Sequence, residues 1–458
     1  MTKFCRWLGV ALGMALLGPV AAGQTSDEGV TLSGDAFLKV PAGVGEVAVA
    51  KTPPTVYVRL FKDLPDGGKG TLWSGWGDGC LASNGKYYTA IGDHLDIHGG
   101  TGQSRLYEFD PAAKSLKMVV NTREVIPDAK LAGGKVHARL EEAADGWLYY
   151  ASYWGKVPKD ADWDAGFRGS ALLRFDPRTG KAECLGVPVP KQGLPTSRMD
   201  AKRGVIYFLA VYSGDLVVYD IAARQVKYRA SGDVQEGNRN IILDADGNAY
   251  FSTKDGTLAR YRPDTRDVEA TKAKLPASAR EPPPSDEGAS SGKARSSRET
   301  KKGVPTLRSS TVPARSGIVY GMTHAGMMFA FDPKAETIRD LGPNFGTGDY
   351  TAVVLLSPDE KYLYYAPGSH GSDVRHGAAL VQFEIATGRR KVLAFLLPPI
   401  RERLKYTLGG TFNLKITADG GTLIGTFNGA PYDPAARKEV AFGQPALLVI
   451  EIPKSERE

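Results

Sequence analysis

The histidines of this 458-residue chain are few, and they are the first side chains that suggest chemistry. Three or four neutral imidazoles that converge on one point would bind a divalent metal such as manganese or zinc. Nearby arginines would attract carboxylate or sulfate groups, and exposed Trp and Tyr rings suit the faces of sugars. A single histidine in a loop, by contrast, is most simply a polar residue bonded to backbone. The chain has six: His94, His98, His137, His324, His370 and His376.

The elements that must position these residues are short strands in a repeating unit. One complete unit runs from Val136 to Gly186, and its runs of Tyr, Trp, Val, Leu and Phe are separated by Asp-Gly and Asp-Pro-x-x-Gly turns, which predict an antiparallel meander of four strands. The third strand recurs as LYEFD, LLRFD, LVVYD, LARYR, MFAFD, LVQFE and LLVIE. A hairpin such as ADGWLYYAS or ADGNAYFST precedes each copy in the same phase.

Seven such units predict an all-β fold, a seven-bladed β-propeller of four-stranded antiparallel blades, because a lone meander cannot bury both of its faces. We expect the propeller to span 55–453, followed by a tail at 454–458. The seventh unit ends without a fourth strand, and Thr55 to Phe61 forms a strand without a unit. We therefore expect this N-terminal strand to complete the last blade and close the ring.

The segments outside the repeats indicate export and one large insertion. Residues 1–23 combine Lys3 and Arg6 with an apolar run and a small-residue end, as a cleaved signal peptide does, so a secreted or periplasmic protein is expected. Residues 24–54 form an irregular lead-in. Residues 272–303, rich in Pro, Ser, Gly and charge, predict a disordered basic insertion between the fourth and fifth blades. We expect Cys80 and Cys184 to be free, buried thiols.

The histidines all fall on one face of this predicted propeller. His137 opens a first strand, whereas the others follow second strands or lie in the loops beyond, and these positions share one side of a meander. First-strand starts add cationic and amide donors, and loops on the same side add aromatics. Besides His137, the candidate residues at this mouth are His94, His324, His370, Tyr153, Arg198, Arg239, Asn240, Arg308, Asn413, Trp73, Trp76 and Trp154.

The histidine-lined mouth is similar to that of secreted propeller polysaccharide lyases, of the oligogalacturonate lyase type with histidines around a divalent metal or the ulvan lyase type with His and Tyr as acid and base. That resemblance implies β-elimination at a uronate. One divalent metal (Mn, Zn or Ca) on His137, His324 and His370, or else Arg198 and Arg239, would neutralise the substrate carboxylate. His94 would be the base and Tyr153 the acid, while Trp73, Trp76, Trp154, Asn240, Arg308 and Asn413 would bind substrate.

Two alternatives remain open. A non-catalytic propeller could bind glycans or another exported protein through the same mouth, with no metal or proton transfer. A lactonase-like hydrolase would need carboxylate and amide metal ligands, and Asp and Glu are scarce at the first-strand starts. The expected partner is an acidic glycan or another small anionic ligand bound by a monomer. We expect no nucleic acid and no membrane span.

Overall fold

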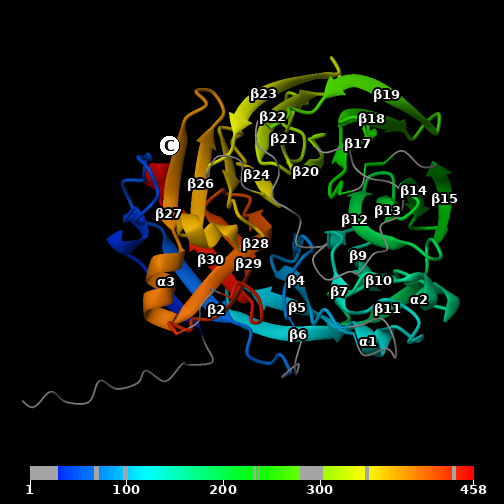
Figure 1. The fold of residues 1–458 in the computed structure, drawn as a ribbon, viewed down its shortest axis with the longest axis horizontal. Helices are drawn as coiled ribbons and strands as arrows, with labels where there is room; N and C mark the ends of the chain where they lie inside the picture. The colour runs from blue at the N-terminus through cyan, green and yellow to red at the C-terminus, as the bar shows by residue number, and fades with distance from the viewer. Residues whose placement is uncertain are drawn as a thin grey trace, which may run out of the picture.

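Seven β-sheets are arranged radially as a ring in the computed structural model of the protein (Figure 1). The structure describes residues 29–65, 72–95, 102–230, 234–235, 237–278, 303–345, 350–435 and 440–458. The predicted signal peptide and most of the insertion at 272–303 lie outside these residues. The predicted seven-bladed β-propeller of four-stranded antiparallel blades is confirmed.

The first three blades follow the chain from inner to outer strand. Blade one contains β3 (Cys80–Leu81), β4 (Tyr87–Gly92), β5 (Ser104–Asp110) and β6 (Ser115–Asn121). Blade two contains β7 (Lys135–Val136), β8 (Glu141–Glu142), β9 (Leu148–Tyr153), β10 (Leu172–Phe175) and β11 (Ala182–Gly186). Blade three contains β12 (Gly193–Asp200), β13 (Val205–Val211), β14 (Asp215–Asp220) and β15 (Gln225–Ala230).

The next three blades repeat this order. Blade four contains β16 (Ile242–Leu243), β17 (Ala249–Ser252), β18 (Thr257–Arg262) and β19 (Asp267–Lys274). Blade five contains β20 (Leu307–Ser310), β21 (Val319–Thr323), β22 (Met327–Asp332) and β23 (Thr337–Pro343). Blade six contains β24 (Val354–Leu356), β25 (Tyr362–Tyr365), β26 (Ala379–Glu384) and β27 (Arg390–Phe395).

The seventh blade joins the two ends of the propeller. Its inner strands are β28 (Tyr406–Ile416), β29 (Thr422–Pro431) and β30 (Ala446–Glu451), and β2 (Thr55–Leu60) pairs antiparallel with β30 from Thr55 opposite Glu451 to Leu60 opposite Ala446. This confirms the predicted closure by an N-terminal strand. A fifth strand, β1 (Val30–Leu32), then pairs with β2 at the outer edge.

Aspartates at the ends of third strands explain why the outer turns recur. The carboxylate of Asp110 accepts hydrogen bonds from the backbone N–H groups of Ala112 and Ala113, and Asp332 does the same for Lys334 and Ala335. A short acidic side chain that satisfies turn N–H groups in this way stabilises the reversal between strands three and four. The Asp-Pro-x-x-Gly segment at Asp176 is a turn of the same kind, as the sequence predicts, because its carboxylate accepts hydrogen bonds from the Arg178 N–H and the Thr179 hydroxyl.

The hydrophobic core lies between blades, with one apolar cluster at each blade-to-blade interface. Successive side chains of a strand point to opposite faces of its sheet, so each strand serves two interfaces. On β9, Tyr149 packs toward blade three and its neighbour Tyr150 toward blade one. The blades therefore form one continuous ring rather than separate units.

The structure corrects several boundaries. The first strand of blade two is split into β7 and β8, which both pair with β9. The lead-in contains β1 and the 3-10 helix η1 (Asp35–Leu38), and β19 continues to Lys274, two residues past the expected start of the insertion. The supposed tail contains η5 (Lys454–Glu456), whose buried Glu456 carboxylate accepts hydrogen bonds from the backbone of Lys51 and Thr52 and from Lys391.

Helices are short and lie between strands: α1 (Thr122–Val125), α2 (Asp160–Asp164), α3 (Leu397–Leu404) and the 3-10 helix η4 (Ser372–His376). Within the described part of the chain, none has the length and apolar character needed to cross a membrane. Within the described residues Cys80 and Cys184 are free thiols, as expected; Cys80 is buried, but Cys184 is partly exposed rather than buried.

Candidate functional site

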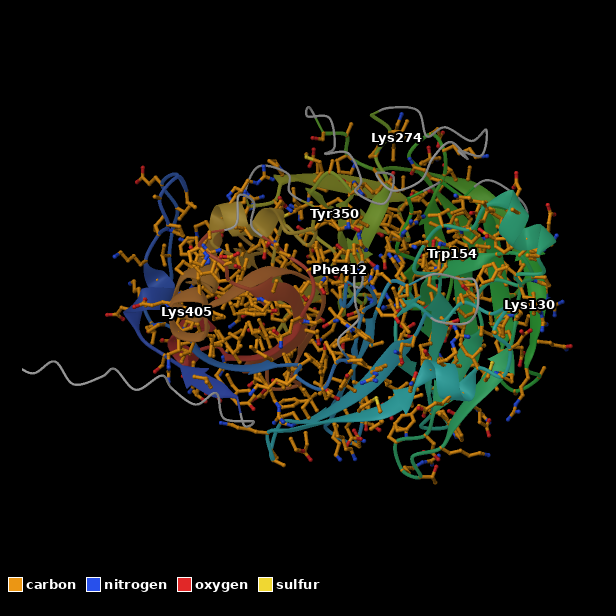
Figure 2. The ribbon with its side chains drawn as sticks, turned by 60° about the horizontal axis from the view of Figure 1, so that its bottom comes forward. Lys130, Trp154, Lys274, Tyr350, Lys405 and Phe412 are labelled. Carbon is orange, nitrogen blue, oxygen red and sulfur yellow. The ribbon has the colours of Figure 1, made fainter. Side chains whose placement is uncertain are left out.

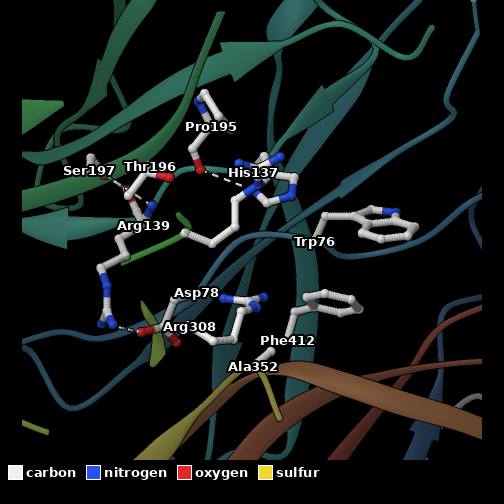
Figure 3. Close-up of a pocket in the computed structure, with 11 residues that line it drawn as sticks. Trp76, Asp78, His137, Arg139, Pro195, Thr196, Ser197, Arg308, Ala352 and Phe412 are labelled. Atoms are coloured by element: carbon white, nitrogen blue, oxygen red, sulfur yellow. Dashed lines mark hydrogen bonds and ion pairs between the residues drawn. The ribbon is translucent and has the colours of Figure 1, made fainter. Parts of the chain in front are cut away.

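A narrow pocket lies where the inner ends of the blades meet, and we call it the central pocket (Figure 3). Its free space is about 20 Å³, enough for a group about the size of one water molecule. All seven blades contribute to it, because the first strand of every blade begins beside the axis of the ring. The lining residues are Trp76, Asp78, His137, Arg139, Pro195, Thr196, Ser197, Arg239, Arg308, Ala352 and Phe412.

The pocket is predominantly cationic. Three arginines and one carboxylate line it, with His137 beside them. The Nδ1 atom of His137 lies 3.0 Å from the carbonyl oxygen of Pro195, which makes that nitrogen the protonated one and turns Nε2 away from this contact. A small anion in the pocket would therefore meet more positive than negative charge.

A chain of polar contacts crosses the ring at the level of Asp78. The Asp78 carboxylate lies 2.7 Å from Arg139 and 2.6 Å from Lys415, so it joins blades one, two and seven. Arg139 also donates to the Asn240 side-chain oxygen at 2.9 Å, and the Asn240 amide donates to Ser310 at 2.6 Å. Arg139 and Lys415 thus both contact the Asp78 carboxylate. Asn240, from blade four, accepts a hydrogen bond from Arg139.

The local sequence explains how Trp76 and Asp78 both reach the pocket. They alternate with glycines in Gly75-Trp76-Gly77-Asp78-Gly79. A Cβ atom at Gly77 would clash with the carbonyl oxygen of Ala138 in the next blade. Only glycine permits this close approach, so the segment lies directly against blade two and presents two side chains to the axis.

Trp76 is surrounded by histidine rings. Its ring centroid lies 5.4 Å from that of His94, 6.3 Å from that of His137 and 5.4 Å from that of His370. Its indole N–H donates to the Ser74 hydroxyl at 2.6 Å, and that hydroxyl lies 2.7 Å from Nε2 of His94. The structure therefore brings three of the predicted histidines together, but around an aromatic ring.

A second group of rings, centred on Tyr350, lies beside Arg308. The Tyr350 ring stacks on His370 at 4.3 Å and meets His324 edge to face at 4.6 Å. Nε of Arg308 donates to the Tyr350 hydroxyl, and the guanidinium also lies 4.6 Å from the ring centroid. Tyr350 and Phe412 both lie near the middle of the ring in Figure 2. A phenol next to a guanidinium and two imidazoles is a group that can exchange a proton.

The metal site predicted on His137, His324 and His370 stays a prediction. The described residues contain no group of three or more His, Cys, Asp or Glu side chains placed to hold one metal ion. Aromatic rings occupy the contacts instead: Trp76 packs on His137 and His370, and Tyr350 packs on His324 and His370.

Several predicted residues lie away from the central pocket. Arg198 is 3.6 Å from Glu141 in a buried pair, where burial lowers the Arg198 pKa and raises the Glu141 pKa. The amide of Asn413 bonds to the Gly77 carbonyl and accepts from the Thr426 N–H, which ties blade seven to blade one. These residues hold the ring together rather than face a ligand.

The remaining aromatic candidates are mostly buried. Trp73 is 4% exposed, and its indole N–H donates to the Pro65 carbonyl. Trp154 is 2% exposed and packs on Tyr153, with ring centroids 4.3 Å apart. Tyr153 meets His137 at 5.7 Å, so it connects the Trp154 cluster to the central pocket. Of the four tryptophan and tyrosine candidates that sequence places at the mouth, Trp76 alone lines the central pocket.

The loop that carries His94 contains a strongly perturbed carboxyl group. Asp93 is fully buried, and burial raises its pKa to about 6, although its oxygens accept hydrogen bonds from the backbone N–H groups of Leu95 and Gln103. His94 itself has a left-handed backbone conformation, with φ of 56°. His98 lies outside the described residues, and His376 contacts Phe345.

Sequence reasoning missed four residues of the site: Asp78, Lys135, Arg139 and Tyr350. Lys135 is nearly buried, with its ammonium 5.0 Å from the Trp76 ring centroid. Arg139 follows His137 by two residues, and both lie between β7 and β8, where the first strand of blade two is interrupted. This spacing is the signal in the sequence for Arg139, because residues two apart in extended chain share a face. Tyr350 lies just before β24, the first strand of blade six.

Comparison with known proteins identifies no family. No family model matches the sequence, and no curated protein matches it. A solved structure described as "Structure of U3-55K" aligns over 86% of this chain and 98% of its own, with 10% sequence identity and a TM-score of 0.49. A likeness at that level carries no argument about this chain. The function must therefore be argued from the site.

Proposed function

We propose that the protein is an exported propeller that binds the anionic group of an acidic saccharide in the central pocket. The observation that carries this proposal is the composition of the pocket, in which Arg139, Arg239 and Arg308 line the same small space as His137, with Asp78 as the one acidic side chain among them. Guanidinium groups bind carboxylate and sulfate through paired, charge-assisted hydrogen bonds.

The dimensions of the pocket restrict what enters it. About 20 Å³ admits one oxygen atom of a carboxylate or sulfate group but not a sugar ring. The ring of the saccharide would remain outside the pocket beside Trp76, whose ring is partly exposed and lies 4.8 Å from the tilted ring of the buried Phe412. Anion recognition inside and a partly exposed aromatic ring beside it together favour a uronate or sulfated sugar over a free inorganic anion.

A catalytic version of this proposal is favoured by Tyr350. In β-elimination a base removes the C5 proton of a uronate, the C4–O bond breaks as the C4=C5 double bond forms, and an acid protonates the departing oxygen. Arg308 would neutralise the carboxylate and so acidify the C5–H bond. Tyr350, bonded to Arg308 and flanked by His324 and His370, is suited to one of the two proton transfers. We favour Tyr350 over the predicted acid Tyr153 because Tyr350 contacts Arg308, whereas Tyr153 packs against His137 and Trp154.

The test uses untagged mature protein with oligogalacturonate, oligoalginate and a sulfated uronate polysaccharide as probes. Calorimetry measures binding, and ultraviolet absorbance of the unsaturated product measures elimination. We expect Arg308→Gln to weaken binding by about 10-fold or more, because a hydrogen bond to a charged group contributes about 1.5–3 kcal/mol. Tyr350→Phe should retain binding and abolish any elimination.

The matched control is Arg315→Gln, which removes an exposed arginine of the same blade from the hairpin between β20 and β21. Binding that survives Arg308→Gln, or that falls equally with Arg315→Gln, would contradict the pocket as the anion site. Binding without any unsaturated product would leave the non-catalytic propeller as the function. Absence of binding to all three probes would reject the proposal.

A further inference from the structure

A second, wider pocket lies on blades two and three, outside the site described above. Asp160, Trp163, Asp164, Lys191 and Tyr212 line it, and it is a broad, open depression with about 350 Å³ of free space, within the size range of small-molecule sites. Three of these residues come from α2 at positions i, i+3 and i+4, which share one face of a helix. We call this the aromatic pocket.

Two aromatic rings form perpendicular walls of the aromatic pocket. The rings of Trp163 and Tyr212 lie 5.7 Å apart with an interplanar angle of 87°. Trp163 is only partly buried, and behind it Phe167 packs at 5.0 Å. The Trp163 ring is therefore held in place while part of its surface stays accessible, as a stacking platform requires.

The backbone of Tyr212 is held in an unusual conformation that positions its ring. Its φ is 81°, a left-handed value that is uncommon for a bulky side chain. The Tyr212 hydroxyl donates to the Pro158 carbonyl at 2.9 Å, and the next residue, Ser213, donates its N–H to Gln192 at 3.0 Å. Such strain persists where surrounding contacts fix it, and it is frequent at ligand-binding positions.

The charges around the aromatic pocket indicate the class of ligand. Asp160 and Asp164 are exposed carboxylates, so they oppose an anion, and the exposed ammonium of Lys191 opposes a cation. Together they offer acceptors and donors for hydroxyl groups. The weakly positive C–H face of a sugar ring matches the negative face of Trp163. We propose that the aromatic pocket is a binding site for a neutral sugar residue.

Packed aromatic rings connect the aromatic pocket to the central pocket. From Trp163 a continuous series of ring contacts runs through Trp154 and Tyr153 to His137, with centroid distances of 6.2, 4.3 and 5.7 Å. Trp154 lies within the cluster of side chains on this side of the ring in Figure 2. The two sites are thus joined by one packed layer, yet their charges select different sugars. The inference stands whether or not the central pocket binds an anion.

Binding of neutral oligosaccharides tests this site. The full-length mature protein is titrated by calorimetry with cellohexaose, xylohexaose, mannohexaose and β-1,3-linked glucohexaose, and with choline chloride as the cationic probe. We expect at least one hexaose to bind, and Trp163→Ala to weaken it by about tenfold, the effect of losing one stacking platform. Trp163→Phe, which keeps an aromatic face, should retain most of the affinity and reports that the fold is intact.

Arg308→Gln is the control from the other site, and it should leave hexaose binding unchanged. Four results would overturn the inference: no hexaose binds, binding is unaffected by Trp163→Ala, binding is lost with Arg308→Gln instead, or only choline binds in a Trp163-dependent way. Because acidic probes report on the central pocket and neutral probes on the aromatic pocket, failure of one proposal is distinguishable from failure of the other.

Discussion

Replacing Asp78 by Asn should affect stability and ligand binding in opposite directions. The Asp78 carboxylate lies 2.7 Å from Arg139 and 2.6 Å from Lys415, and all three side chains are less than a quarter exposed. Removing the Asp78 charge leaves Arg139 and Lys415, both poorly solvated, without the carboxylate that neutralises them. Breaking a buried ion pair costs about 3–5 kcal/mol, and the residual exposure here reduces our expectation to about 3 kcal/mol.

The same substitution removes the acidic side chain that lines the central pocket. At an effective dielectric constant of about 20, the lost repulsion and the released Arg139 should improve the binding energy of a singly charged anion by about 1–2 kcal/mol. We therefore expect the dissociation constant for an oligogalacturonate to fall by about tenfold. A purely structural role for Asp78 predicts weaker binding instead.

The assay pairs thermal unfolding with calorimetric titration at low ionic strength. An unfolding entropy of about 2 cal/mol/K per residue over this propeller converts 3 kcal/mol into a fall of about 4 °C in Tm. Glu402→Gln is the control, because Glu402 is an exposed acid on α3 and its loss changes net charge equally. If Asp78→Asn bound the anion more weakly than the control at a temperature where both are folded, the electrostatic reasoning would be refuted.

Four further predictions follow from other parts of the molecule. Burial raises the Asp93 pKa to about 6 from 3.8, so the stability that depends on its protonated form is present below about pH 4 and is lost as the pH rises through 6. Urea unfolding should show this loss of stability, about 3 kcal/mol at most. In Asp93→Asn the loss between about pH 4 and pH 6 should disappear. If the variant had the same pH profile as the parent protein, Asp93 would not be the group responsible. Glu456→Ala should lower the free energy of unfolding by about 3 kcal/mol, because the carboxylate accepts three hydrogen bonds in a buried position. Chemical denaturation measures this free energy, and a loss below about 1 kcal/mol would contradict the structural role of Glu456. Elemental analysis of untagged protein beside a His137→Ala/His324→Ala variant tests the predicted metal: about one equivalent lost in the variant would restore that hypothesis. Mass spectrometry of the exported protein should find cleavage after Gly23, and an intact N-terminus would reject the signal peptide.

The repeated architecture was predictable because each blade carries its own local signal. The third strands end in Asp at Asp110, Asp220 and Asp332, where the carboxylate accepts turn N–H groups. Turn chemistry of this kind depends on a few adjacent residues, so it can be read without tertiary information. The closing strand at Thr55 was predictable for a related reason. The last unit lacks a fourth strand, and the strand that begins at Thr55 belongs to no unit of its own.

The site was less predictable, because a shift of one residue along a strand reverses the face that a side chain occupies. Arg139, between β7 and β8, reaches the axis, whereas Arg198, on β12, pairs with Glu141. The break between β7 and β8, which sets the position of Arg139, has no marker in the sequence. Trp154 illustrates a second limit: an aromatic residue in a loop can be buried by other loops, and hydrophobicity alone does not distinguish that case from an exposed sugar platform.

The pairing of β2 with β30 has a consequence for how the chain acquires its structure. The last blade cannot form until residues near 451 have left the ribosome, although its fourth strand is among the first segments made. Contacts separated by almost the whole sequence slow folding, because the entropy of closing the loop must be overcome before they stabilise anything. Until β2 pairs with β30, the ring has two open sheet edges. A chain held too long with these edges open would be prone to aggregate.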